Sequence, residues 1–189
     1  MSAYVLTGGT NAFAVELAGH LRAPVQREPA GPATSWVHLL PGDGATDETA
    51  ALVRACDAAD EHLPHGEGAG FVAVVPVWGA VAPPHDAQIE LAAAAARALA
   101  TVRVERWSRE GRRINVIAYG GLDTVSLPGL RPAAELIART PAHRLASVAE
   151  LANAVDFVSS AAASYVTGSV LPVDGGWTAY SWFHPARDL

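Results

Sequence analysis

The 189-residue sequence predicts an α/β domain built on a doubly wound parallel sheet, with helices on both faces. Three observations carry this prediction. The chain opens with a strand, a glycine turn and a helix, which is the start of a nucleotide-binding βα unit. Apolar strand patterns then alternate with helical ones, and residues 71–77 form an unbroken apolar run, typical of a strand buried on both faces. We expect one domain over residues 1–189.

The first half of the chain contains three predicted strands. Residues 4–6 are apolar and lead through Thr7-Gly8-Gly9-Thr10 into a helix at 11–21, whose apolar stripe includes Phe13, Leu17 and Leu21. Residues 22–35 are rich in Pro, Gly and Ala and predict a loop, with room for one short strand at 25–27. A strand at 36–40, a helix at 48–63 capped by Thr46 or Asp47, and the strand at 71–77 follow.

The second half continues the alternation. An alanine-rich helix is predicted at about 86–107, followed by a buried strand at 114–118 and a short helix at 132–139. Ser147 with Glu150 three residues later forms a capping box for a helix at 148–159. The last strand is expected at 169–173, before Asp174-Gly175-Gly176.

Composition excludes several classes of protein. The net charge of −6 argues against a large nucleic-acid interface, which needs a basic patch. No apolar run reaches the roughly 18 residues of a membrane span, and no signal peptide is visible, so a cytoplasmic protein is expected. Cys56 is the single cysteine, and the histidines lack the regular spacing of a zinc site, so no metal is expected.

All thirteen basic residues are arginine, and the sequence contains no lysine. The chain therefore cannot form a Schiff base, use a phosphate-binding lysine or use an ammonium of tunable pKa as a catalytic group.

The C-terminal half carries three consecutive motifs. Residues 113–124 read RINVIAYGGLDT, residues 144–155 read RLASVAELANAV, and residues 163–176 read ASYVTGSVLPVDGG. Together, over about residues 112–180, they resemble the short-chain dehydrogenase/reductase family. This resemblance implies a Rossmann-like fold and descent from NAD(P)-dependent oxidoreductases.

The residues that bind the cofactor in that family are altered here. Thr7, Gly8, Gly9 and Thr124 resemble its cofactor-binding positions, but the later glycines of its turn are Ala12 and Ala14, and alanine resists the close approach of a pyrophosphate. The family's NNAG motif falls on Pro41-Gly42-Asp43-Gly44, which places a carboxylate near phosphates. We expect these positions to be vestigial and no cofactor to bind this chain.

The catalytic residues that the resemblance implies are also missing. The family's tyrosine and lysine positions fall on Gln88 and Ala92, and the strand of its catalytic serine reads VVPVW at residues 74–78. Gln88 cannot exchange a substrate proton, and Ala92 carries no charge. The short segment at 22–35 further implies that one or both edge strands before the family's fourth strand are lost, together with the adenosine half of the site.

These features predict a catalytically silent subunit that pairs with an active NAD(P)-dependent homologue as a heterodimer or heterotetramer, or with itself. The family's equivalent of the alanine-rich helix lies in a subunit interface, and the tail is aromatic. The expected interface residues are Ala92, Ala96, Tyr165, Trp177, Trp182 and Phe183.

Two alternatives remain open. In one, new acid–base chemistry uses Asp43, His85, Asp86, Glu90 and Tyr119, if these converge in one pocket. In the other, the chain is a homodimer that binds a small ligand.

Overall fold

A computed structural model of the protein describes residues 4–8, 11–26, 33–40, 47–66, 68–77, 87–123 and 133–179. At residues 87–89 it describes the backbone alone. Its centre is a five-stranded parallel sheet in the order β1-β2-β3-β4-β5. The strands are β1 (Tyr4–Thr7), β2 (Ser35–Leu39), β3 (Ala69–Pro76), β4 (Arg112–Tyr119) and β5 (Val170–Val173). The helices are α1 (Ala12–Leu21), α2 (Glu48–His62), α4 (Ala87–Arg109), α5 (Ala133–Arg139) and α6 (Val148–Ser159), with a 3-10 turn, η1 (Ala161–Ala163).

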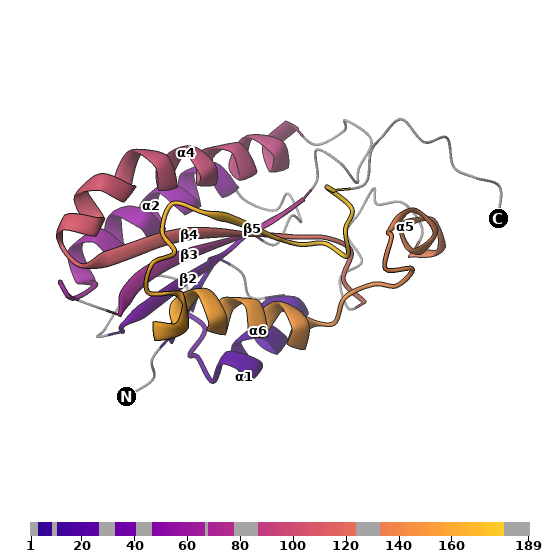
Figure 1. Ribbon diagram of the computed structural model, residues 1–189, viewed down its shortest axis with the longest axis horizontal. Coiled ribbons are helices and arrows are strands. Elements are labelled where there is room, and N and C mark those ends of the chain that lie inside the picture. Colours follow the sequence, from indigo (N-terminus) through magenta and orange to yellow (C-terminus); the bar gives the residue numbers. More distant parts are fainter. Residues whose placement is uncertain are drawn as a thin grey trace.

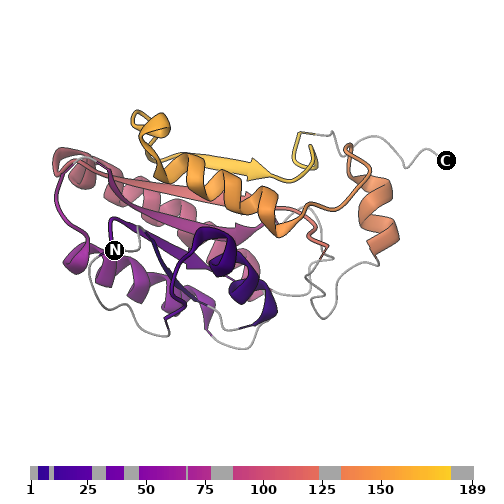
Figure 2. The same cartoon turned by 90° about the horizontal axis from the view of Figure 1, so that it is seen from below.

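Helices cover both faces of the sheet, as the sequence predicts. α2 and α4 lie together on one face, while α1 and α6 pack against each other on the opposite face (Figure 1). α5 lies apart from both layers, beyond the end of the sheet at which the strands finish (Figure 2). The predicted doubly wound α/β fold is confirmed.

Each central strand sends alternate side chains into two separate cores. In β3, Phe71 and Val75 enter the core under α2 and α4, whereas Val72 and Val74 enter the core over α1 and α6. All eight residues of β3 are buried. The continuous apolar run therefore corresponds to a strand covered on both faces.

The edge beside β1 is shortened. The predicted strand at 25–27 is reduced to one bridge at Val25: Leu6 donates its N–H to the Pro24 carbonyl (3.2 Å), and its own carbonyl accepts from Gln26 (2.9 Å). Both backbone groups of Leu6 are engaged in this bridge, so Val25 lies on the side of β1 away from β2. The chain then returns across β1 to form β2. The connection thus reverses direction at β1, which defines the topological switch point of the sheet.

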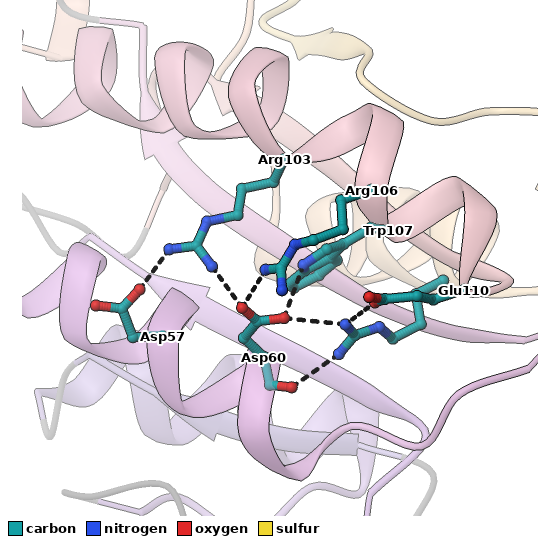
Figure 3. A network of polar contacts seen from close by, with 7 residues as sticks. Asp57, Asp60, Arg103, Arg106, Trp107 and Glu110 are labelled. Carbon is teal, nitrogen blue, oxygen red and sulfur yellow. Dashed lines mark hydrogen bonds and ion pairs between the residues drawn. The ribbon is translucent and has the colours of Figure 1, made fainter.

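The two helices on one face are joined by a polar network around Asp60 of α2 (Figure 3). The carboxylate accepts from Arg103 (2.8 Å), Arg112 (2.9 Å), the Trp107 indole N–H (3.1 Å) and Arg106. The Arg112 guanidinium also lies over the Trp107 ring, 4.7 Å from its centroid, and pairs with Glu110. One carboxylate therefore ties α2 to the C-terminal half of α4 and to β4.

The capping predictions hold. Asn11 caps α1 rather than forming its first residue, because its side chain accepts from the Ala14 N–H (2.9 Å). Asp47 caps α2, while Thr46 lies outside the described residues. Ser147 and Glu150 form the predicted capping box, with the Ser147 N–H donating to Glu150 (2.9 Å).

Replacing Glu150 by Gln is expected to lower the free energy of unfolding by about 0.5–1 kcal/mol near pH 7, because one capping bond and the exposed Arg144 pair are weakened. Hydrogen bonds from Arg144 and then Ser147 lower the pKa of Glu150 from 4.5 to about 2. A lowered folded-state pKa adds stability above the ordinary value, and this stability is lost as the pH falls from 4.5 toward 2. Urea unfolding of the wild type and of Glu150→Gln should therefore show a difference in the free energy of unfolding at pH 7 that disappears near pH 2. Glu105→Gln, at an exposed pair with Arg109, is the control.

Among the described residues, no helix combines the length and apolarity that crossing a membrane requires.

Candidate functional site at the switch point of the sheet

The candidate site lies where the strands end around the switch point between β1 and β2. In open α/β sheets, ligands bind in the crevice outside the carboxyl ends of the strands at such a point. The turn after β1, the residue after β2 and the start of α1 border this crevice. These are the positions at which the sequence predicts the remains of a cofactor site.

The Thr7 hydroxyl is engaged by two side chains of its own protein. It is buried, accepts a hydrogen bond from the Trp36 indole N–H (3.1 Å) and lies 2.9 Å from Nδ1 of His38. Burial, and to a smaller extent the positive charge of Arg54, lowers the pKa of His38 to about 4. His38 is therefore neutral at pH 7, and the tautomer of its imidazole decides whether Nδ1 or the Thr7 hydroxyl is the donor in their hydrogen bond.

Gly8 cannot be replaced by a larger residue without displacing backbone. Its φ is +103°, and a Cβ at this position would lie 2.0 Å from the carbonyl oxygen of Leu39. The turn after β1 therefore packs directly on the end of β2. Gly9 and Thr124, the other predicted cofactor-binding positions, lie outside the described residues.

The N-terminus of α1 uses one of its first N–H groups for its own cap. Asn11 uses its side chain to cap the helix, and Ala14 is fully buried. Ala12 stands where the turn's first later glycine is expected. The N–H of Ala14 is thus already satisfied by Asn11 and is not available to an anion.

Tyr119 crosses the end of the sheet. It belongs to β4, only 1% of it is exposed, and its hydroxyl donates to the carbonyl oxygen of Leu40 (3.1 Å), the residue after β2. Its ring meets that of Phe13 in α1 edge to face, with centroids 5.4 Å apart and an interplanar angle of 68°. The side chain therefore spans from β4, past β3, to the end of β2 on the α1 side.

The described catalytic positions carry no acid–base group. Ala92 is fully buried against the sheet, and the backbone of Gln88 lies in α4 while its side chain is outside the described residues. Of the alternative acid–base set, Asp43, His85 and Asp86 lie outside the described residues. Glu90 is partly buried in the first turn of α4. Tyr119 is committed to Leu40, so its hydroxyl is not available to a substrate.

The structure revises the predicted interface residues. Ala92 and Ala96 face the protein's own sheet and are buried there, so neither can contact a partner. The outward side of α4 instead presents Leu91 (62% exposed) and Val102 (78% exposed). Tyr165 is fully exposed, as an interface residue should be, whereas Trp177 is buried. Trp182 and Phe183 lie outside the described residues.

Comparison with known proteins identifies the family. A protein-family model, described as enoyl-(acyl carrier protein) reductase, matches residues 48–178, which is more than half of the chain. The chain belongs to the short-chain dehydrogenase/reductase family.

Two curated relatives show how far the likeness extends. The chain is 39% identical to cis-4-hydroxycyclohexanecarboxylate dehydrogenase of Sinomonas cyclohexanicum over 123 residues, 62% of this chain and 49% of that protein. It is 34% identical to an uncharacterized short-chain type dehydrogenase/reductase of Sinorhizobium fredii over 142 residues, 71% of this chain and 25% of that protein. The chain thus spans a quarter to a half of the length of these relatives.

Solved structures agree on the fold. A short-chain dehydrogenase/reductase from Serratia marcescens superposes with a TM-score of 0.75 at 14% identity, covering 93% of this chain and 97% of that one. At this identity the likeness describes the fold alone.

The described residues do not fit the nicotinamide dinucleotide that the family implies. The Thr7 hydroxyl is hydrogen-bonded to Trp36 and His38, one of the first N–H groups of α1 donates to Asn11, and the Tyr119 side chain lies across the strand ends. The sequence also lacks a lysine to hold a ribose. We therefore derive no chemical step through this cofactor.

Proposed function

We propose that the chain is a catalytically silent subunit of the short-chain dehydrogenase/reductase family, which pairs with an active NAD(P)-dependent homologue. The partner would be of the carbonyl reductase or 3-hydroxyacyl dehydrogenase type, in a heterodimer or heterotetramer. The observation that carries the proposal is the Tyr119 side chain, buried across the strand ends and bonded to Leu40.

The absence of catalytic chemistry is supported by residue types alone. A proton relay in this family's manner needs a tyrosine hydroxyl beside an ammonium, and this sequence has no lysine. Ala92, at the lysine position, points into the core. The purified chain is therefore expected to show no oxidation of NADH or NADPH with carbonyl substrates.

Pairing is supported by the outward side of α4. Leu91 and Val102 lie eleven residues apart, three helical turns, and small alanines stand between them. Exposed large apolar residues in line on a helix are typical of a contact surface, and small neighbours allow another helix to approach closely. Tyr165, which follows η1, is fully exposed and offers a second contact for a partner.

Native mass spectrometry of the protein purified from its own host tests the proposal. A complex with a full-length, lysine-containing dehydrogenase is the expected result. Val102→Arg should abolish that complex, because it places a charge on the outward side of α4. Val15→Arg places the same charge at an exposed position on α1 (59% exposed), on the opposite face of the sheet from α4, and should leave the complex intact.

Other outcomes contradict the proposal. Nicotinamide-dependent activity of the chain alone would refute catalytic silence. A homodimer that Val102→Arg dissociates would replace the heteromeric partner with a second copy of this chain, and a monomer would remove the pairing role altogether.

A further inference from the structure

Tyr119 makes two contacts of the kind that a bound ring would make at the switch point. One is a hydrogen bond to a backbone carbonyl at the end of β2, and the other is an edge-to-face contact with Phe13 at the start of α1. Both contacts cross from one element of the fold to another more than 75 residues away in the sequence. The side chain thus joins β4 to the end of β2 and to α1, two of the elements that border the crevice.

We infer that Tyr119 is a built-in substitute for a ligand, and that the space its ring occupies is a latent site for a small hydroxylated aromatic compound. This inference rests on one part of the proposed function, namely that the chain binds no cofactor, and it does not depend on pairing with another subunit. The ligand chemistry follows from the two contacts: a planar ring that fits against Phe13, and one hydroxyl that donates to the Leu40 carbonyl.

The surroundings of Tyr119 favour a stable cavity rather than collapse when the ring is removed. Val37, Leu39, Val74 and Ile117 lie on strands of the same core and are buried to 3% exposure or less. Sheet strands held by hydrogen bonds on both sides cannot close readily over a deleted ring, so most of the ring's volume should remain. The Leu40 carbonyl would then be a buried acceptor without its Tyr119 donor, which favours a ligand that carries a hydroxyl.

The test is chemical rescue of Tyr119→Ala by phenol. We expect the variant to unfold at a lower temperature than the wild type, and phenol at ten times its Kd to raise the Tm of the variant by roughly 3–6 °C. Calorimetric titration should give saturable binding of phenol, with benzene weaker because it cannot donate to Leu40. Neither the wild type nor Tyr119→Phe, which keeps the ring, should bind phenol.

The result remains decisive if Tyr119→Ala does not fold alone. Refolding with phenol present should then recover folded protein, and failure to do so would overturn the inference. Equal effects of phenol on the wild type and on Tyr119→Ala would also overturn it, as would equal binding of benzene and phenol. Because these measurements use the chain alone, they separate this inference from the pairing test.

Discussion

Replacing Arg113 by Ala is expected to lower the free energy of unfolding by about 3 kcal/mol or more, and the Tm by roughly 6–12 °C. Arg113 in β4 is 8% exposed, and its guanidinium donates to five backbone carbonyl oxygens. These belong to Val158, Ser159, Ser160, Ala163 and Val166.

The carbonyl groups explain the size of the effect. They lie at the end of α6 and in the turn that follows, where helix carbonyls have no partners in their own helix. A cation at a helix C-terminus also interacts favourably with the helix dipole. Burial lowers the pKa of Arg113, but a guanidinium remains charged at pH 7. Without it, all five carbonyls lose a charged donor, while those of Ser160, Ala163 and Val166 keep a second donor from the Ala163 N–H, the Val166 N–H and the Asn115 amide.

Two variants separate hydrogen bonding from packing. Arg113→Met keeps an apolar side chain of similar length and should lose nearly as much stability as Arg113→Ala, because both variants remove the same charged donor from the carbonyls. Arg109→Ala, at an exposed residue of α4, should change the free energy of unfolding by about 0.5 kcal/mol or less. Denaturant titration measures all three. A small effect of Arg113→Met would mean that the arginine stem, not its hydrogen bonds, stabilises this region.

The order of strands and helices was predictable because burial leaves a clear signature in apolar sequence. β3 and β4 are buried on both faces; β3 is a continuous apolar run and β4 is apolar except at Arg112, Arg113 and Asn115, so both were predicted within two residues of their observed ends. The caps of α2 and α6 were predictable because capping depends on a local side chain and a backbone N–H three residues away, whereas Asn11, the cap of α1, was assigned to the helix itself. The predicted ends of the helices and strands differ slightly from the observed ends, because these ends depend on hydrogen bonds with other elements.

The orientation of α4 was not predictable. Its central residues are nearly all alanine, so its sequence shows no contrast between a buried and an exposed side, and Ala92 and Ala96 were assigned to the wrong side. Among the described side chains of α4, Leu91 and Val102 are the large apolar residues that are exposed, and the position of the sheet shows that they lie on the outward side.

The contacts of the candidate site were hidden for a related reason. Tyr119 bonds to a backbone carbonyl, and a carbonyl has no sequence signature. The contact of Thr7 with Trp36 and His38 depends on the register of β1 against β2, which sets Thr7 opposite His38. Register follows from three-dimensional pairing and not from either strand alone. Residue types predicted the loss of lysine-based chemistry, but not the hydrogen bond between Tyr119 and Leu40.

Replacing Asp60 by Ala is expected to lower the free energy of unfolding by about 2–3 kcal/mol. Arg112, whose side chain is 1% exposed, would keep Glu110 but lose its shared carboxylate, and the Trp107 indole would lose the acceptor at 3.1 Å (Figure 3). The penalty of a buried charge that loses a partner exceeds the worth of an exposed pair. Asp57→Asn, at a carboxylate that is 56% exposed and pairs with Arg103, should change stability by about 0.5 kcal/mol or less.

The charge of Asp60 makes its contribution depend on pH. Burial alone would raise its pKa, but hydrogen bonds and charges from Arg106, Arg112 and Arg103 outweigh burial, so the pKa lies below the ordinary 3.8. A carboxylate whose folded-state pKa is lowered contributes stability above its unfolded pKa, and this contribution is lost as the pH falls through the folded value. Asp60→Asn keeps the shape of the side chain and removes the charge, so its deficit relative to the wild type should be full at pH 7 and shrink below about pH 4. A deficit that stays constant from pH 7 to pH 2 would assign the role of Asp60 to hydrogen-bond geometry rather than to its charge.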